Sequence, residues 1–519
     1  MKKLKYLLFS LLLLLIITSL FACKNEQAQG GQKQSGAADG TEWEDVDYSG
    51  TLLKISLSVD QDRNKTTLPH SERYIRGSDA NLSDTVQNMA YDRNARVEAM
   101  IGIAVQYIEC HHQYDKVSEY IDELVMAAND GTPDIFIDDV YGAIRSAMNG
   151  SLYNVLDQSE KNYFNFTEEN GWYIDYMDGL SLDPARVKYI LAGDYFIDVL
   201  RETFVLFVNI DRYEETFGEE IQFFYDTIKA GDFTYDYFSQ MIEVAWAPGP
   251  NNRTSKAAVD DDLIGFVIDS IGVYPFLWAS NGEGNRLFTK NAQGEYEVLY
   301  DNTTYFTFAQ DVYDLLTAQP VYITKEDGQS AEKRTSFLFA NGNVLFAEGM
   351  WLADLEAPEI RDMEQRKGVT VYPKQNGSIA TYNTFVHDTA ESGSIALSTQ
   401  KFTECTAYLQ CINQQSSGLI TEYKEYALKY KYNKDYATIE MIDLIYDTIG
   451  SPFETIMSQM AFDMTNTVHG ANGINTPKNF MNRYVHSNVP FSFAHDYQTS
   501  YNVYVAGLTA LKNKFANAN

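Results

Sequence analysis

The distribution of apolar residues after residue 50 predicts strands that alternate with helices. Every second residue is apolar across residues 53–59 and again from Ile103 to Tyr107, which is the period of a half-buried β-strand. Residues 135–137 form a short continuous apolar run, which we predict to be a buried strand. The first part of the chain therefore contains three candidate strands.

Two amphipathic helices are predicted between these strands. One begins near Ser83, a good capping residue, and ends at Gly102. The other covers residues 117–128, where apolar side chains recur at helical spacing, and Gly131 and Pro133 stop it. A strand–helix–strand–helix–strand series favours parallel strands joined by helical crossovers. We therefore predict an α/β fold.

Later segments mix the two kinds of element. Residues 204–210 are typical of a buried strand, and residues 287–300 predict a hairpin around Asn-Ala-Gln-Gly. Residues 308–316 predict a helix, and roughly the last hundred residues look mainly helical. No internal repeat is visible in the sequence.

The N-terminus has the layout of a secretory signal. Lysines precede an apolar stretch over residues 6–17, which is shorter than the about 20 residues that a spanning helix needs. Leu-Phe-Ala-Cys at residues 20–23 is similar to the bacterial lipobox, whose cysteine becomes the lipid-modified first residue. We predict a signal peptide over residues 1–22, then a lipidated Cys23 and a flexible tether over residues 23–43 that anchor the chain outside the cell membrane. A plain signal peptide with an incidental cysteine is the alternative.

Charge narrows the range of partners. The formal net charge is −32. An excess of negative charge of that size disfavours binding to nucleic acid and to anionic lipid headgroups. We expect the chain to reach the membrane through its lipid anchor only.

Three cysteines remain in the predicted mature chain, Cys110, Cys405 and Cys411. An odd number in an exported protein cannot all pair internally. Cys405 and Cys411 lie six residues apart on different faces of a predicted helix, so they should not bond each other. A bond from Cys110 to one of them stays open, but we favour buried thiols.

Catalytic signatures are missing from the sequence. It has no Gly-x-Ser-x-Gly, His-Glu-x-x-His, Cys-x-x-Cys or phosphate-loop motif. Its pair of neighbouring histidines, His111 and His112, would not face one site in a strand, so we predict a surface pair and no metal. Composition leaves a glycosidase pair of carboxylates open. We predict a protein that is not an enzyme and uses no cofactor.

A series of motifs carries a family resemblance. They are LVMAANDGTPDIFI, LFVNIDRYEE, WASNGEG, FLFANGNVLFAEGMW, residues 393–397 before a helix, and residues 435–449. In this order, behind a lipobox, they resemble the extracellular solute-binding proteins of ABC importers, in the carbohydrate-binding group that includes maltose-binding protein. The resemblance covers most of residues 50–450.

The resemblance implies two α/β lobes that close on a ligand at a hinge. Residues 44–155 plus 382–425 would form the N-terminal lobe, and residues 156–381 plus 426–519 the C-terminal lobe. The implied function is capture of a sugar or other small molecule for the permease subunits of an ABC transporter, by a monomer. A peptide-binding receptor, a surface glycoside hydrolase and a polysaccharide-binding adhesin are the alternatives.

The same resemblance implies a set of ligand contacts, since sugar sites combine aromatic faces with planar polar side chains. The implied positions, which follow strands or match motifs, are Asp60, Asp62, Arg63, Asp138, Asp139, Tyr141, Glu202, Tyr274, Trp278 and Trp351.

Each of these positions has a simpler interpretation. Asp62 and Arg63 fit a solvated loop, and Asp138 or Asp139 fits a helix cap. Glu202 could be a surface carboxylate. Tyr274, Trp278 and Trp351 could belong to the core.

Overall fold

The structure is a computed structural model. It describes residues 43–59, 72–78, 84–112, 115–247, 263–268, 273–278, 286–318, 320–324, 335–425, 427–428, 438–463, 476–487 and 489–517. Residues 115, 274, 278, 349 and 350 are described by their backbone alone.

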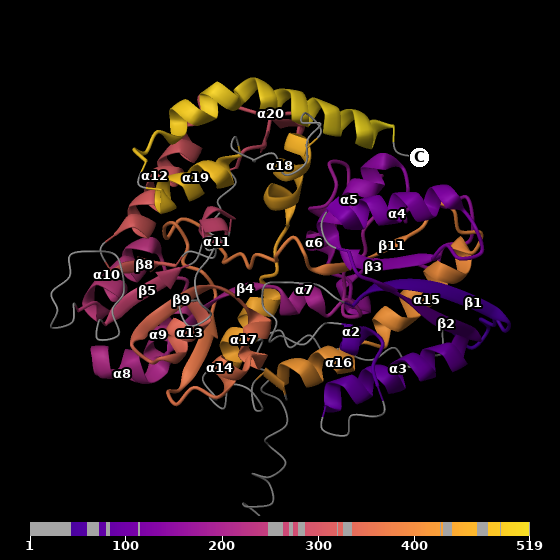
Figure 1. The fold of residues 1–519 in the computed structure, drawn as a ribbon, viewed down its shortest axis with the longest axis horizontal. Helices are drawn as coiled ribbons and strands as arrows, with labels where there is room; N and C mark the ends of the chain where they lie inside the picture. The colour runs from indigo at the N-terminus through magenta and orange to yellow at the C-terminus, as the bar shows by residue number, and fades with distance from the viewer. Residues whose placement is uncertain are drawn as a thin grey trace, which may run out of the picture. The chain divides into compact units, whose positions relative to one another are not determined.

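The first sheet has the strand order β11-β3-β1-β2. Its strands are β1 (Thr51–Ser58), β2 (Ile103–Cys110), β3 (Ile135–Asp139) and β11 (Glu391–Ile395). β1 runs parallel to β2 and β3, as the crossover pattern predicts, whereas β11 is antiparallel to β3. Figure 1 shows α4 (Asp115–Ala127) and α5 (Val140–Asn149) on one face of this sheet and α3 (Thr85–Ile101) and α15 (Phe402–Gln414) on the other.

Two local predictions for the first sheet need correction. The alternation over β1 predicts one polar face, but Ser56 and Ser58 are fully buried, because helices cover both faces of the sheet. The cap of α3 is Asp84, whose carboxylate accepts the Gln87 N–H, and Ser83 lies outside the described residues. Gly102 ends α3 as predicted, with φ of 73°.

The second sheet has the strand order β10-β4-β9-β5-β8. Its strands are β4 (Phe204–Asn209), β5 (Ile264–Ile268), β8 (Val321–Ile323), β9 (Val344–Trp351) and β10 (Lys367–Thr370). β5 is parallel to β8 and β9, whereas β4 is antiparallel to β9 and β10. The helices packed on these strands include α8 (Ile210–Phe217), α10 (Tyr235–Ala245), α13 (Thr335–Ala340) and α17 (Thr438–Asp447).

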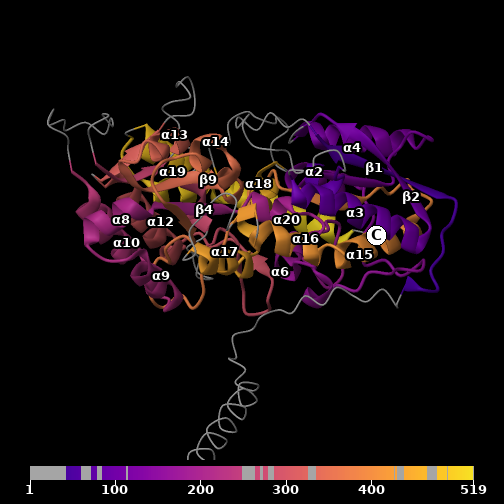
Figure 2. The ribbon, with the colours of Figure 1, turned by 90° about the horizontal axis from the view of Figure 1, so that it is seen from below.

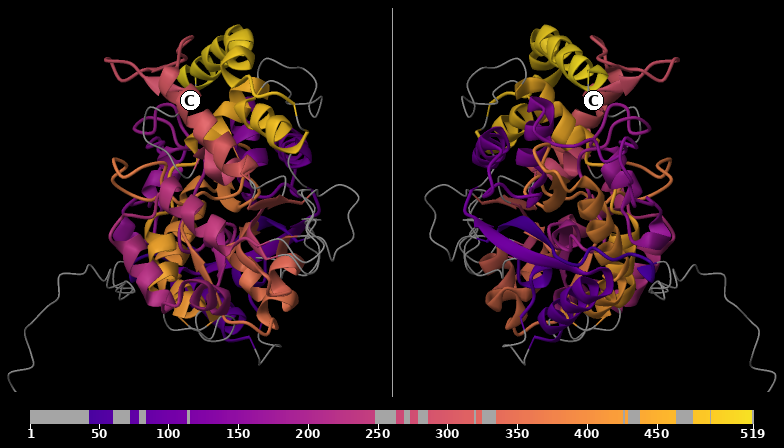
Figure 3. Two further views of the ribbon diagram at one scale, coloured as in Figure 1. Left: turned by 90° about the vertical axis from the view of Figure 1, so that its left-hand side faces the viewer. Right: turned by 90° about the vertical axis from the view of Figure 1, so that its right-hand side faces the viewer.

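The predicted hairpin and the helical C-terminus are confirmed. β6 (Thr289–Lys290) and β7 (Tyr296–Glu297) pair antiparallel, and α12 (Thr303–Thr317) follows. The last helices are α18 (Phe453–Asp463), α19 (Pro477–His486) and α20 (Phe493–Ala516). Figure 3 shows α20, in yellow, next to the pink segment with the hairpin, where the Tyr497 hydroxyl donates to the Leu299 carbonyl at 3.1 Å.

Short helices connect these elements. They are α2 (Glu72–Ile75), η2 (Glu168–Asn170), α6 (Ile174–Asp178), α7 (Asp198–Arg201), α9 (Ile221–Lys229), α11 (Val273–Trp278), η4 (Leu352–Glu356), α14 (Pro358–Arg361) and α16 (Ser417–Glu422). Among the described residues, no helix combines the length and the apolar character needed to cross a membrane.

The chain returns to the first sheet after it has built the second. β11 pairs with β3 through Glu391↔Asp139 to Ile395↔Ile135, and an isolated bridge joins Thr203 to Val386. Figure 2 shows α15 and α16 beside α3, which precedes them by some 300 residues. The lobe boundaries implied by the resemblance stay a prediction.

All three described cysteines are buried, and none forms a disulfide bond. The preference for thiols over a bond from Cys110 is therefore confirmed. Burial raises the pKa of the Cys405 thiol well above its ordinary value, which disfavours the reactive thiolate.

Candidate functional site

Two acidic residues end the third strand of the first sheet. Asp138 and Asp139 belong to β3 rather than to a loop after it, because β11 extends the pairing to Asp139. The Asp139 carboxylate accepts the Gly142 N–H at 2.7 Å and caps α5, the alternative that the sequence left open. Burial, with the charges of Asp139 and Glu391, raises the pKa of Asp138 well above its ordinary value. Burial thus disfavours the charged form of Asp138 inside the sheet.

Tyr141 lies in the first turn of α5 and is 6% exposed. Its hydroxyl donates to the Asp463 carboxylate at the end of α18. The Arg145 guanidinium lies 5.7 Å from the centre of its ring. Tyr141 therefore connects a helix of the first sheet to the C-terminal helices.

Glu202 follows α7 and is only 1% exposed, so its interpretation as a surface carboxylate is wrong. Its Oε2 accepts the Thr389 hydroxyl at 2.7 Å and lies 3.9 Å from His387 Nδ1. The Glu202 carbonyl accepts the His387 N–H at 3.0 Å. These bonds hold the carboxylate against the segment that leads into β11.

Trp351 ends β9 and is 4% exposed, which agrees with the core interpretation. Its ring centre lies 5.1 Å from that of His387 and 6.4 Å from that of Phe204. The same imidazole therefore lies against Glu202 and Trp351, two predicted site residues that the sequence separates widely.

A β-bulge precedes Trp351. The β4–β9 register shifts between Val205 and Phe207, so that two residues of β9, Glu348 and Gly349, face one residue of β4. Glu348 is fully buried, and its Oε1 accepts the Tyr372 hydroxyl at 3.0 Å. Bulges bend a strand and change where its side chains point, and here the bend comes directly before the tryptophan.

A buried cation lies next to Glu202 in the sequence. Arg201 is 2% exposed, and its guanidinium lies 3.2 Å from Asp198 Oδ1 and 3.3 Å from Glu356 Oε1. The Tyr423 hydroxyl donates to the same Glu356 oxygen at 2.6 Å. Burial by itself would lower the pKa of Arg201, but Glu356 and its other partners hold that pKa well above its ordinary value.

These groups link elements of both sheets through one turn of helix, α7. We call Asp198, Arg201, Glu202, Glu356, His387 and Thr389 the junction cluster. Asp198 also accepts the Glu391 N–H of β11 at 3.1 Å, and Glu356 belongs to η4, directly after β9.

Several predicted site residues are not placed. Asp60, Asp62, Arg63 and Cys23 lie outside the described residues. Tyr274 and Trp278 belong to α11, and only their backbone is described. Their roles remain predictions.

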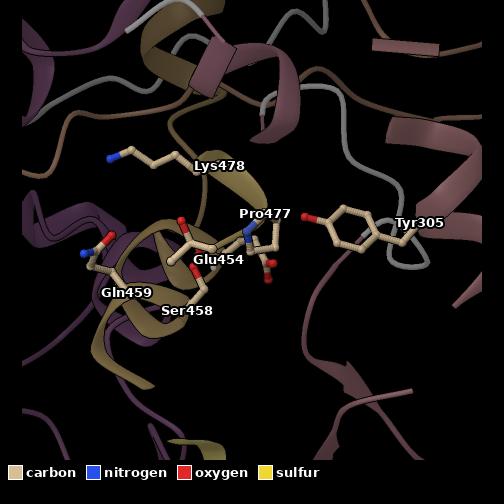
Figure 4. A pocket seen from close by; sticks show the side chains of 7 residues that line it. Tyr305, Glu454, Ser458, Gln459, Pro477 and Lys478 are labelled. Carbon is tan, nitrogen blue, oxygen red and sulfur yellow. Dashed lines mark hydrogen bonds between the residues drawn. The ribbon is translucent and has the colours of Figure 1, made fainter. Parts of the chain in front are cut away.

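One pocket was not anticipated. It lies where α12, α18 and α19 meet, and its volume is about 240 Å³ when the open solvent at its mouth is included. Figure 4 shows the side chains that line it, Tyr305, Glu454, Ser458, Gln459, Thr476, Pro477 and Lys478. Its acidic member, Glu454, lies in the first turn of a helix, which is an ordinary place for a surface glutamate, so the sequence held no signal for it.

Within the described residues, no three His, Cys, Asp or Glu side chains are grouped to hold a metal ion. His111 and His112 are both exposed, as predicted for a surface pair.

Comparisons with known proteins identify the fold. No protein-family model matches the sequence, and no curated protein matches it. The GacH receptor of Streptomyces glaucescens, solved without ligand and with acarbose, is 11% identical with a TM-score of 0.50, over 90% of this chain and 99% of that one. RafE of Streptococcus pneumoniae, in its apo form, is 13% identical with a TM-score of 0.51, over 88% and 99%. An ABC substrate-binding protein of Listeria monocytogenes, in complex with cycloalternan, is 11% identical with a TM-score of 0.47, over 90% and 98%.

The similarity to GacH and RafE extends over nearly the full length of each of those two proteins. They confirm the predicted fold class, the two-lobe α/β fold of periplasmic binding proteins.

Proposed function

We propose that this chain, which has the fold of those receptors, is the substrate-binding protein of an ABC importer and captures a sugar or oligosaccharide. The observation that carries the proposal is the likeness to GacH along 99% of that receptor, which was solved with the saccharide analogue acarbose. Delivery of the captured sugar to a membrane permease follows from this role.

The chemistry of the described residues supports a sugar ligand. Trp351 offers an aromatic ring, His387 beside it offers a planar polar group, and Glu202 on His387 offers another. All three are buried, so they would reach a sugar only if the lobes move or side chains shift. We propose that closure around the ligand is a population shift between open and closed lobes.

Titration calorimetry with maltose, raffinose, acarbose and a set of tripeptides to pentapeptides tests this function. We expect one saccharide to bind in a 1:1 ratio without being consumed. Binding of peptides alone would establish the peptide-receptor alternative. Release of a shortened sugar would establish a glycoside hydrolase, and retention on insoluble polysaccharide without binding of soluble sugar would establish an adhesin.

Replacement of Trp351 by Phe tests the site within that function. The smaller ring should still fill the core but should weaken binding of the saccharide by ~1 kcal/mol, the lower part of the range for loss of ring stacking measured with nucleic-acid bases. Trp172→Phe is the matched control, because Trp172 is equally buried and bonds to Gln410 instead. Equal saccharide affinities of the two variants would show that Trp351 does not contact the ligand.

We also propose that the chain is exported and held at the membrane by a lipid on Cys23. The lysines, the apolar stretch and the lipobox-like residues 20–23 support this anchor. Mass spectrometry of the N-terminal peptide from membranes tests it, with Cys23→Ser as the control. An unmodified Cys23 would contradict it.

A further inference from the structure

The first half of α20 is attached to elements that belong with the second sheet. The Tyr497 hydroxyl donates to the Leu299 carbonyl at 3.1 Å, and the Gln498 amide donates to Asp301 Oδ1 at 2.7 Å. On α12, the ring centre of Tyr305 lies 6.0 Å from that of Tyr497. α12 leads directly into β8, which pairs with β5 of the second sheet. This end of α20 therefore belongs with the part of the chain that builds the second sheet.

The middle of α20 lies directly against α18. Gly507 leaves no room for a side chain, because a Cβ atom there would come within 2.1 Å of the Ala461 carbonyl oxygen. The backbones of the two helices thus touch at this point. Asp463, two residues further along α18, accepts the Tyr141 hydroxyl of α5 on the first sheet. From its middle onward, α20 therefore approaches elements of the first sheet.

The last turn of α20 is bound by an arginine from another segment. Arg186 Nη2 donates to the Phe515 carbonyl at 2.6 Å, and Phe515 itself is only 2% exposed. A cation beside the last carbonyls of a helix is favourable, because it opposes the partial negative charge at that end. The C-terminus of α20 is therefore held in place as firmly as its start.

The segment that carries Arg186 packs on the first sheet. The Asn154 amide donates to the Arg186 carbonyl at 3.0 Å, and its side-chain oxygen accepts the Lys188 N–H at 3.0 Å. Shortly afterwards an isolated bridge joins Leu191 to Gly393 of β11. The two ends of α20 are thus attached to different sheets.

α20 makes this connection apart from the segments where the chain passes between the sheets. Bridges join Thr203 to Val386 and Thr384 to Ile449, so three segments lie side by side at that passage. α20 has 24 residues and is therefore about 36 Å long. Figure 1 shows it running from α12 and α19 to the side of α5. A helix of this length is a stiff connection in addition to the three short segments.

We propose that α20 is a strap that limits how far the part built on the first sheet can move against the part built on the second. Lobes of binding proteins move by rotation at the segments that connect them. Because α20 is attached at both ends, such a rotation must bend it or release one end. The strap rests on the two-lobe fold and does not depend on which ligand is captured.

The end at Arg186 should yield first. Its hydrogen bond comes from one side chain that is 49% exposed, whereas the other end combines two hydrogen bonds with ring packing. Exposed charged contacts are weak because water screens them. The contact between Arg186 and Phe515 is therefore the place where movement of the two parts is set.

Double electron–electron resonance between two spin labels measures that movement. Glu123→Cys on α4 and Gln240→Cys on α10 carry the labels, since both native side chains are exposed and the described native cysteines are buried. We expect Phe515→Ala, which removes the buried ring, to broaden the distance distribution of the doubly labelled chain. Arg186→Met should broaden it less, and it serves if Phe515→Ala does not fold.

Asp183→Asn is the matched control. Asp183 pairs with the Arg186 guanidinium within the same segment, so the variant loses an ion pair but keeps the bond from Arg186 to Phe515. Its distance distribution should equal that of the wild type. Broadening in Asp183→Asn to the same extent as in Arg186→Met would overturn the proposal.

Hydrogen exchange separates a strap from a helix end that merely frays. In Arg186→Met the amides of the last two turns of α20 should exchange roughly two- to fivefold faster, the scale expected for loss of a cation at a helix C-terminus. Faster exchange together with a broadened distance distribution supports the strap. Unchanged distance distributions in both Arg186→Met and Phe515→Ala would overturn it, whatever the exchange rates.

Discussion

The buried carboxylates of the junction cluster and of the Glu454 pocket have different partners. In the junction cluster, Glu356 and Asp198 lie against Arg201, and Glu202 accepts the Thr389 hydroxyl. In the pocket, Glu454 is almost as buried, but one oxygen has no partner among the described residues. Asp198 and Glu356 are thus paired with a buried cation, whereas Glu454 accepts a backbone N–H.

The difference separates positioning from recognition. A buried charge with well-placed partners holds elements in one geometry and is costly to disturb. A buried carboxylate without such partners is destabilising when ionised, and proteins keep such groups mainly where binding or chemistry uses them. The first kind helps to hold elements of the two sheets together, and the second makes the charge of Glu454 sensitive to pH near 7.

The strongest test of this comparison is Arg201→Met. The variant keeps a long apolar side chain but leaves Asp198 and Glu356 without their cation, so we expect the free energy of unfolding to fall by ~3–5 kcal/mol. Chemical denaturation at pH 7 measures the change. Arg361→Met is the control, since its ion pair with Asp362 is exposed and should be worth ~0–1 kcal/mol. Equal losses in both variants would contradict a structural role of the junction cluster.

Glu454→Gln should raise the free energy of unfolding at pH 8, whereas Arg201→Met lowers it. The folded pKa of about 7 lies above the ordinary value of 4.5, so the folded chain binds this proton more tightly than the unfolded chain. The resulting stability is fully present below pH 4.5 and is lost as pH rises through 7. At about 1.4 kcal/mol per pKa unit, the loss at pH 8 is roughly 3 kcal/mol. We expect Glu454→Gln to be more stable than the wild type at pH 8 and to lose this advantage at pH 4.5.

Thermal unfolding across that pH range checks the sign, with Glu243→Gln on the exposed face of α10 as the control. A wild-type advantage at pH 8 would show that Glu454 is a stabilising charge like those of the junction cluster. The contrast between the two regions would then disappear.

The smallest expected effect belongs to Thr389. Thr389→Val keeps the shape of the side chain but removes the hydroxyl that donates to Glu202, so we expect a loss of about 1–3 kcal/mol in unfolding free energy. Thr389→Ser retains the hydroxyl and should recover most of that loss. If Val and Ser behave alike, the methyl group rather than the hydrogen bond matters at this position.

Local pattern predicted much of the fold because its causes are local. The alternation over β1, the helical spacing over α4 and the turn inside the β6–β7 hairpin all depend on residues a few positions apart. Gly102 ends α3 with φ of 73°, a conformation that glycine adopts at little cost. The order of the motifs predicted the two-lobe fold class, which the comparisons with GacH and RafE confirm.

The candidate site depended on partners far away in the sequence. Motif position pointed to Glu202 and Trp351, but only the tertiary structure shows that both are buried and lie against His387. Asp139 matched a ligand position, yet its carboxylate caps α5. A motif indicates which residue stands at a position, whereas burial and orientation depend on the elements that pack around it.

By itself the sequence determined the strand and helix pattern, the acidic charge and the lysine-then-apolar layout of the N-terminus, since each follows from neighbouring residues or from composition. Tertiary structure alone decided that β11 extends the first sheet, that a bulge precedes Trp351 and that Glu454 faces a pocket. The physical reason is that pairing register, burial and open space are properties of segments brought together by folding, and no stretch of the chain encodes them alone.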